Sequence, residues 1–182
     1  GSIIEALGQR KGIMKNMVAE NGNTMLEFEC PTRGILGFRS IFLLLTKGEG
    51  TFYHAFSHFS PYVGPIQKRQ VGSMISGENG TALSYALYNL QARGPLFIGP
   101  STAVYEGMII GEHNQGTDLT VNPTKGKKLT NVRASGSDDA LTLTPPIEIN
   151  LEKAIEYIKD NEYVEITPST IRLRKKYLTE NE

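Results

Sequence analysis

The sequence predicts an α+β protein made of two consecutive units. Its first 60 residues follow the order helix, strand, strand, helix, strand, which is one strand short of the βαββαβ motif of the split-βαβ sandwich. Pro61 and Pro65 then interrupt this pattern, and a longer stretch of mixed helices and strands follows. We therefore expect an incomplete βαββαβ domain over residues 1–68 and a mixed α/β domain with a long basic loop over residues 69–182.

The N-terminal unit opens with a short helix and a β-hairpin. Apolar residues at positions 3, 4 and 7 predict a helix over residues 3–10, and a glycine two residues later provides its stop. Two alternating segments follow at residues 14–18 and 25–30, a pattern that is typical of half-buried strands. The Asn21-Gly22 pair between them tolerates the positive φ of a tight turn, so the two segments are expected to form a hairpin.

A second helix and a third strand complete the N-terminal pattern. Residues 35–45 are apolar enough for a buried helix, and residues 51–59 alternate as a strand. The missing element is the first strand of the motif, which would lie in the middle of the sheet. Gly1-Ser2 stands in place of an initiator Met, as after removal of a tag by a protease, so we expect a piece of a longer protein. Its unpaired strand edges predict artefactual dimers, strand exchange or loss of order within residues 1–65.

The boundary between the units is expected near residues 67–72, where the charge balance changes sign. Residues 1–70 carry 8 Lys or Arg and 5 Asp or Glu, whereas residues 71–182 carry 11 and 14. Beyond the boundary, periodicity and turn residues predict a strand at 73–76, a helix at 81–93, strands at 96–98 and 104–110, a basic loop at 111–135, a strand at 140–143, a helix at 151–159 capped by Asn150, and strands at 163–166 and 171–174.

Composition places the chain among soluble globular proteins. Of its 182 residues, 39% are hydrophobic and 21% are charged, and the formal net charge is zero. No apolar run approaches the ~20 residues that span a bilayer, and the start lacks the charged and apolar regions of a signal peptide. Cys30 is the single cysteine, which excludes an internal disulfide and a cysteine-based zinc site. We therefore expect a cytoplasmic protein with no membrane partner.

The sequence lacks the motifs of the common enzyme classes. A phosphate-binding P-loop needs Gly, four residues, and then Gly-Lys-Ser/Thr. The nearest match ends at Gly126, but Val121 stands where the first glycine belongs and Lys128 replaces the hydroxyl residue. His54 and His58 have no carboxylate near them in sequence to complete a metal site, and the lone cysteine is expected to be a small buried hydrophobe. We expect neither catalysis nor a bound metal, and an unrecognised hydrolase is kept as an alternative.

The main functional candidate is a turn-rich basic loop at residues 122–135, which carries four cations and no acidic residue. On a neutral chain, such a compact positive spot indicates a phosphate-rich partner that is met at a defined place. A glycine and a proline shape the loop, and shaped loops on rigid scaffolds are where binding residues concentrate. The alternative is an ordinary solvated loop. The candidate phosphate-binding residues are Lys125, Gly126, Lys127, Lys128, Asn131 and Arg133.

Two smaller basic groups are candidates for secondary contacts. One lies in the segment RGILGFR, residues 33–39, where glycines close to a helix indicate tight packing or close approach of another backbone. The other lies in and after the predicted strand at 171–174, where alternate residues share one face and would form a positive platform. For this second group, a solubilising tail is the alternative. The secondary candidates are Arg33, Arg39, Arg172, Arg174, Lys175 and Lys176.

Five segments together resemble the C-terminal part of the TypA/BipA family, bacterial translational GTPases related to elongation factor G. They cover nearly the whole chain, and the segment at residues 104–135 is the most specific. Departures such as Cys30 before Pro31 fall at scaffold positions. The segments are RGILGFRSIFLLLTKGEG (33–50), ALSYALYNLQARGPLFIGP (82–100), VYEGMIIGEHNQGTDLTVNPTKGKKLTNVRAS (104–135), ALTLTPPIEINLEKAIEYI (140–158) and VEITPSTIRLRKKYL (164–178).

The resemblance implies that residues 3–65 are most of the fifth domain of the parent, a ferredoxin-like module, and that residues from 70 onward are the family-specific C-terminal domain. In the family, the basic loop of that domain reaches the large ribosomal subunit, near rRNA and the acceptor end of A-site tRNA. The parent would act in ribosome assembly and in translation under stress, with GTP and Mg held by an upstream domain. These residues would then carry no cofactor and no enzyme activity. A protein–protein interaction module without direct RNA contact is the alternative function.

Overall fold

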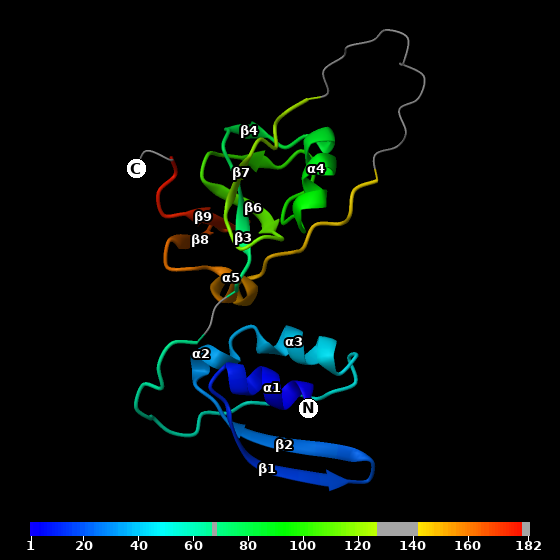
Figure 1. Cartoon of the computed structure of the whole chain (residues 1–182), viewed down its shortest axis with the longest axis vertical. Helices are drawn as coiled ribbons and strands as arrows, with labels where there is room; N and C mark the ends of the chain where they lie inside the picture. The colour runs from blue at the N-terminus through cyan, green and yellow to red at the C-terminus, as the bar shows by residue number, and fades with distance from the viewer. Residues whose placement is uncertain (67–68, 127–141, 180–182) are drawn as a thin grey trace. The chain divides into compact units, whose positions relative to one another are not determined.

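The computed structural model describes residues 1–66, 69–126 and 142–179 (Figure 1). The chain divides into two compact units, Gly1–Lys68 and Arg69–Glu182. Both units contain helices and strands, so the predicted α+β class is confirmed. Within the described ranges, no helix is both long enough and apolar enough to cross a membrane.

The N-terminal unit begins with the predicted helix and hairpin. Helix α1 (Ser2–Gln9) leads into strand β1 (Ile13–Glu20), which pairs antiparallel with strand β2 (Asn23–Glu29). Asn21 and Gly22 turn the chain with φ values of 52° and 79°, in the left-handed region that such a turn requires. Both predictions are confirmed, because their signals lie within a few residues of the structures they specify.

Two short helices replace the single helix expected over residues 35–45. Helix α2 (Thr32–Ile35) and helix α3 (Phe38–Leu45) are separated by Gly37, whose φ of 72° redirects the chain. Phe38, the first residue of α3, is fully buried. The break therefore places this aromatic ring in the core of the unit.

The predicted strand at residues 51–59 is wrong, because residues 51–66 contain no helix or strand. Phe52 is held instead by other aromatic rings, with its centroid 5.7 Å from that of Phe38 and 5.5 Å from that of Phe42. In the βαββαβ motif this last strand pairs with the first one, and the described part of the chain has no strand before α1. Alternation does not produce a strand where the pairing edge is missing.

The C-terminal unit is built on a mixed sheet whose five described strands have the order β7-β3-β6-β9-β8. Neighbouring strands are antiparallel, except β3 and β7, which are parallel. The strands predicted at 73–76, 163–166 and 171–174 are confirmed. The members of the sheet are β3 (Gly72–Ser76), β6 (Met108–His113), β7 (Leu119–Val121), β8 (Glu162–Ile166) and β9 (Ile171–Lys175).

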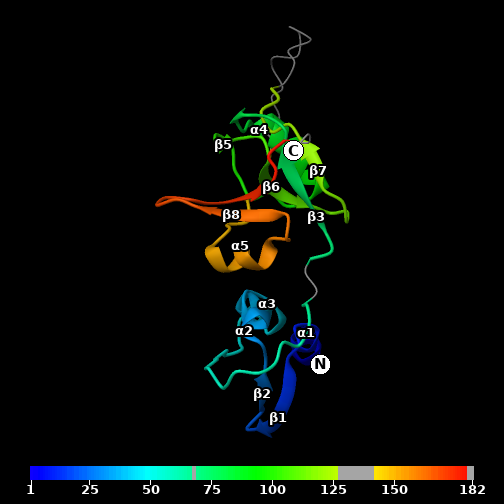
Figure 2. The same cartoon turned by 90° about the vertical axis from the view of Figure 1, so that its left-hand side faces the viewer.

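Helix α4 covers one face of this sheet (Figure 2). It spans Ser84–Leu90 and continues as a 3-10 turn at Gln91–Arg93. Its Leu87 is buried in a core with Met74 of β3 and Ile110 of β6. Since side chains alternate along a strand, the intervening residues of β3 and β6 face the other side of the sheet.

Helix α5 (Leu151–Tyr157) covers that other side, where its Ala154 shares a core with Ile109 of β6. The helix starts at its predicted cap: the Asn150 Oδ1 accepts a hydrogen bond from the Lys153 N–H at 2.8 Å. The predicted helix and cap are therefore confirmed.

Two boundaries near α4 differ from the prediction. The helix expected from residue 81 begins three residues later, because Gly80–Thr81 forms a short strand, β4, paired with β5 (Ala103–Val104). The strand expected at 104–110 is interrupted at Gly107, whose φ of 84° turns the chain between β5 and β6.

The strands expected at 96–98 and 140–143 are not found in the described residues. Leu96 makes only an isolated bridge to Gly111, and residues 142–143 are not in a strand. Residues 140 and 141 lie outside the described ranges. The basic loop expected over 111–135 starts later than predicted, because β6 continues into its first residues and β7 occupies its middle.

Candidate nucleic-acid interface

The basic loop leaves the sheet from a firmly held turn. After β7, the Asn122 Oδ1 accepts hydrogen bonds from the Thr124 N–H at 2.9 Å and from the Thr124 Oγ1 at 2.8 Å. The Pro123 side chain is fully buried, and its carbonyl oxygen accepts from the Leu83 N–H at 3.0 Å. The turn is therefore fixed to itself and to the segment that enters α4.

Lys125 and Gly126 follow this turn, and both are exposed. A β-carbon on Gly126 would meet only Leu83, at the ordinary contact distance of 3.8 Å. Packing within the described chain therefore does not require glycine here. The remaining loop candidates lie outside the described residues and stay predictions: Lys127, Lys128, Asn131 and Arg133.

Arg172 and Arg174 lie on the open face of the ribbon formed by β8 and β9. Val164 and Leu173 pack in the core under α5, so alternation places the two arginines on the opposite face. Arg174 is paired in register with Tyr163, and its guanidinium carbon lies 5.3 Å from the centroid of that ring. The arginines thus share one face, as the spacing predicted.

Lys175 does not belong to that face, contrary to its inclusion in the predicted platform. Its side chain is only 11% exposed, and its Nζ lies 2.9 Å from the Glu162 Oε1 and 2.5 Å from the Asp118 Oδ2. Two carboxylates satisfy this ammonium inside the fold, so it is not presented to an external phosphate. Lys176 is exposed, and its Nζ lies 5.5 Å from the Tyr177 ring centroid.

Glu162 is the centre of a buried charge network beneath the ribbon. Its side chain is 0% exposed, and both carboxylate oxygens accept from the Arg69 Nη2, at 2.7 and 2.8 Å. Burial alone would raise the pKa of Glu162, but hydrogen bonds from Arg69 and Lys175 outweigh it and lower the pKa to about 2. The sequence gives no signal for this pair, because its members lie 93 residues apart and neither belongs to a local motif.

The same network joins the start of the C-terminal unit to α5. The Arg69 guanidinium carbon lies 3.8 Å from the Tyr157 ring centroid, and the Arg69 Nε donates to the Tyr157 carbonyl oxygen at 2.9 Å. Burial raises the pKa of Tyr157 to about 12, so its phenol stays neutral. The network therefore fixes the sheet and helix that support the ribbon.

One carboxylate shares the open face of the ribbon with the arginines. Glu165 is paired in register with Arg172, and its carboxylate accepts a hydrogen bond from the Tyr105 hydroxyl. Burial, together with this bond to Glu165, raises the pKa of Tyr105 well above its ordinary value. The open face thus holds cations, exposed aromatic surface and a single carboxylate whose hydrogen-bonding capacity is partly used.

In the N-terminal unit, the two arginines of the RGILGFR segment lie in different settings. Arg33 is half-buried, donates from its Nη2 to the Gly64 carbonyl oxygen at 2.5 Å, and places its guanidinium carbon 4.7 Å from the Tyr62 ring centroid. Arg39 is exposed on α3. A β-carbon on Gly34 would lie 2.5 Å from the Arg10 carbonyl oxygen, so this glycine permits tight packing.

Two observations on the described residues concern metal ligands and the single thiol. No group of three His, Cys, Asp or Glu side chains in these ranges could hold a metal ion. Cys30 is half-buried, with its Sγ 3.5 Å from the Arg10 carbonyl oxygen, and burial raises the pKa of its thiol. A raised pKa disfavours the thiolate, which is the nucleophilic form.

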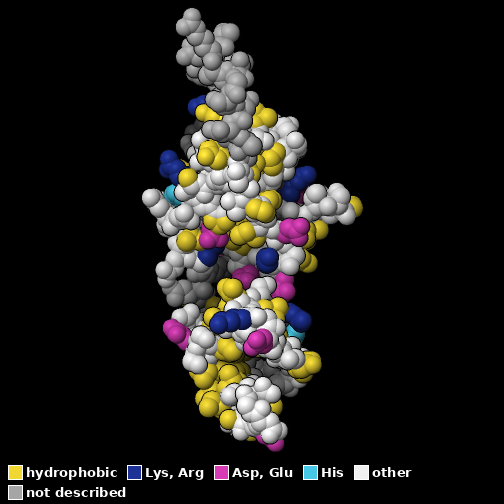
Figure 3. Space-filling view, turned by 90° about the vertical axis from the view of Figure 1, so that its right-hand side faces the viewer, with side chains coloured by type: hydrophobic (Ala, Val, Ile, Leu, Met, Phe, Trp, Pro, Cys, Tyr) yellow, Lys and Arg dark blue, Asp and Glu magenta, His cyan; other side chains and the backbone are white. Residues whose placement is uncertain are grey.

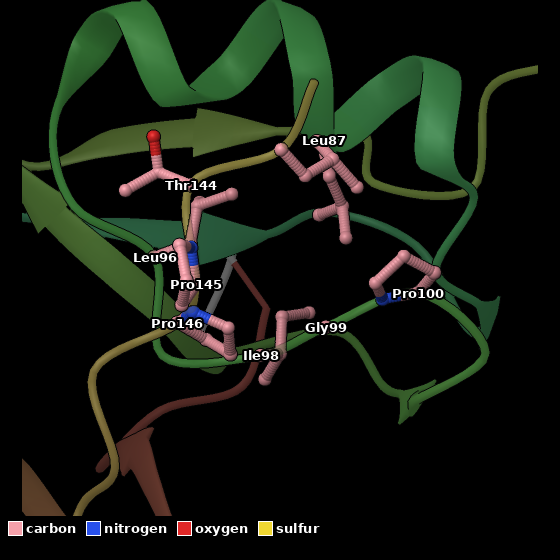
Figure 4. A pocket seen from close by; sticks show the side chains of 9 residues that line it. Leu87, Leu96, Ile98, Gly99, Pro100, Thr144, Pro145 and Pro146 are labelled. Carbon is pink, nitrogen blue, oxygen red and sulfur yellow. The ribbon is translucent and has the colours of Figure 1, made fainter. Parts of the chain in front are cut away.

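A small hollow of about 180 Å³ lies beside α4 (Figure 4). Leu87, Leu96, Ile98, Pro145 and Pro146 contribute apolar lining, and no charged side chain takes part. Such a lining does not suit phosphate. On the face drawn in Figure 3, the described Lys and Arg side chains lie as separate spots among apolar, uncharged and acidic ones.

Residues 71–180 match the family described as TypA/BipA C-terminal domain, and residues 1–70 match the one described as elongation factor G C-terminus. The chain is 50% identical to the large ribosomal subunit assembly factor BipA of Salmonella typhimurium and to that of Escherichia coli (strain K12). It is 52% identical to the protein of the same name from Haemophilus influenzae. These alignments cover 100% of this chain but only 30% of each relative.

Proposed function

The chain belongs to the TypA/BipA family, and from this membership we propose that it is the RNA-binding part of a large ribosomal subunit assembly factor. In this role the basic loop docks on ribosomal RNA close to the acceptor end of A-site tRNA. The parent protein would work in the cytoplasm, in ribosome assembly and in translation under stress. GTP and Mg would be held by parts of the parent outside this chain, which spans 30% of the length of its relatives.

The observation that supports this proposal is the fixed root of the basic loop. The hydrogen bonds of Asn122 and Pro123 hold the point from which the cations depart, while Lys125 and Gly126 are exposed beyond it. A binding residue that directly follows a rigid turn is presented at a defined place, and Lys125 is such a residue. On a chain of formal net charge zero, that placement favours a specific phosphate-rich site over general adhesion to polyanions.

The loop would bind by neutralising charge, not by reading base edges. Each phosphate that is neutralised releases counterions, so the affinity falls with salt in proportion to the number of contacts. Four cations predict a log–log slope of about −3 for a protein on RNA. Gly126 would let the backbone approach a phosphate closely, because no β-carbon stands in the way.

The test is co-sedimentation of this chain with purified large ribosomal subunits across a salt series. We compare the wild type with the triple variant Lys125→Ala, Lys127→Ala, Lys128→Ala. The expected result is salt-sensitive binding by the wild type, with weaker binding and a slope flatter by about 2–3 in the variant.

A matched control replaces three lysines of the N-terminal unit, Lys11, Lys15 and Lys47, by alanine, which removes the same charge elsewhere. It should bind like the wild type. Equal binding by the loop variant and the wild type, with an unchanged slope, would show that the loop is not the anchor. Equal losses in both triple variants would show that only net charge matters. Binding that is insensitive to salt would favour a protein–protein contact.

A further inference from the structure

We propose that the open face of the β8–β9 ribbon binds an unpaired stretch of RNA, stacking a base on Tyr163 and holding the adjoining phosphates with cations. This inference rests on the proposed function, because it names the form of RNA that the chain contacts. The ribbon face consists of Tyr163, Glu165, Arg172 and Arg174, and the exposed Lys176 follows directly after β9, where its N–H donates to the Asn161 carbonyl oxygen at 2.9 Å.

The ribbon face lies on the side away from α5 and is partly exposed, with Glu165, Arg172 and Arg174 half-buried there. Val164 and Leu173 point into the core under that helix, which leaves their neighbours on the outer face. Strand β8 is at the edge of the described sheet, and Tyr163 is 42% exposed there. A half-exposed ring on a flat strand surface offers a plane on which a base can stack.

The charges of this face suit a phosphodiester chain. Its cations are Arg172, Arg174 and Lys176, and its single carboxylate is that of Glu165. The Tyr105 hydroxyl donates to this carboxylate, and the three cations outnumber its single negative charge. Arg172 and Arg174 are two residues apart on β9, beside the aromatic ring, and Lys176 follows just beyond the end of the strand.

The pairing of arginine with tyrosine favours unpaired RNA over a duplex. The Arg174 guanidinium lies 5.3 Å from the Tyr163 centroid, so a planar cation and a planar ring stand side by side. Single-stranded RNA can stack a base on the exposed part of such a ring while the cation meets an adjoining phosphate, whereas a duplex keeps its bases stacked inside. A duplex would meet only the cations, and Tyr163 would then contribute nothing.

The buried charge network holds strand β9 of the ribbon in place. Lys175, which alternates with Arg174 along β9, is held by Glu162 and Asp118. These contacts hold the strand that carries Arg172 and Arg174, so the strand itself needs no ordering on binding.

The test measures fluorescence anisotropy of a labelled ten-nucleotide oligouridylate, alone and annealed to its complement, at several salt concentrations. The variants are Tyr163→Phe, which keeps the ring, and Tyr163→Thr, which removes it but keeps a strand-forming residue. We expect Tyr163→Phe to bind within about twofold of the wild type, and Tyr163→Thr to bind the single strand about 5- to 100-fold more weakly, the range for losing one stacked base. Duplex binding should not depend on Tyr163.

Two controls separate this inference from the proposed function. Tyr88→Ala removes an aromatic ring of similar exposure, 41%, from α4 and should leave single-strand binding unchanged. The loop variant of Lys125, Lys127 and Lys128 should weaken single strand and duplex alike. Unchanged single-strand binding by Tyr163→Thr, or no wild-type binding to the single strand at low salt, would overturn the ribbon assignment. Sedimentation with ribosomal subunits would still decide the role of the loop.

Discussion

Replacing Glu162 with glutamine removes one buried negative charge while keeping the size of the side chain. The wild-type carboxylate accepts hydrogen bonds from Arg69, Lys175 and the Ser73 Oγ, and its side chain is fully buried. Arg69 and Lys175 are each only 11% exposed, so the variant leaves two cations inside the fold with Asp118 as their nearby carboxylate. The expected result is a large loss of stability in the C-terminal unit.

Two estimates give the size of this loss. Breaking a buried ion pair by removing one partner costs about 3–5 kcal/mol. The pKa provides a second figure, because a fall from the ordinary 4.5 to about 2 corresponds to about 3 kcal/mol at about 1.4 kcal/mol per pKa unit. We therefore expect Glu162→Gln to lower the free energy of unfolding by about 3 kcal/mol at neutral pH.

The same substitution changes how stability depends on pH. The pKa of Glu162 is lower in the folded state than in the unfolded chain, so its stabilisation is complete above pH 4.5 and is lost as the pH falls towards about 2. The wild type should lose this contribution across that window, whereas the variant cannot. The two stability curves should therefore converge in acid.

Urea unfolding, with hydrogen exchange read in peptides covering β8 and β9, measures both effects within the relevant unit. Glu148→Gln is the control, because Glu148 is an exposed residue that precedes α5. The free energy of unfolding of this variant should lie within about 0.5 kcal/mol of the wild-type value. The role assigned to the network would be refuted if the free energy of unfolding of Glu162→Gln lay within about 1 kcal/mol of the wild-type value at pH 7. It would also be refuted if the stability of both proteins fell equally as the pH was lowered.

The other predictions concern local features of the fold. Asn150→Ala removes the cap of α5 and should cost about 1 kcal/mol in urea unfolding, whereas Asn150→Asp should retain the cap. Gly94→Ala should be far more destabilising than Gly22→Ala: a β-carbon at Gly94 would lie 2.0 Å from the Glu112 carbonyl oxygen, while at Gly22 it meets nothing within 4 Å. Both glycines have positive φ, so Gly22→Ala measures the conformational cost alone, about 1–2 kcal/mol. The melting temperature should therefore fall much further in Gly94→Ala than in Gly22→Ala, and the reverse order would contradict the role of packing at Gly94.

Several elements could be predicted because their signals are local. The Asn21-Gly22 turn and the Asn150 cap act on backbone groups within three residues of themselves, and the structure forms both. Alternation in residues 171–174 likewise placed Arg172 and Arg174 on one face. The basic loop was evident from composition, although only its first residues are described.

The wrongly predicted strand at residues 51–59 shows that local sequence patterns do not determine whether a strand forms. Its alternation, with a possible bulge between the aromatic residues, predicted a strand as that of β2 did, yet β2 has a partner in β1 and residues 51–59 have none in the described chain. A strand is satisfied by hydrogen bonds to another segment, so its existence depends on residues that its own sequence does not contain. The interruption at Gly107 was missed for a related reason: a glycine can continue a strand or end it, and packing around it decides.

The sequence by itself determined the class of the fold, its caps and turns, and the cationic character of the candidate interface, because each depends on residue type and short spacing. Only the tertiary structure decided which cations face outwards. Arg174 and Lys175 are adjacent and both basic, but one stands beside Tyr163 on the open face and the other is held by Glu162 and Asp118. The free energy that separates these two roles comes from burial and from carboxylates distant in the sequence, and only the folded chain brings them together.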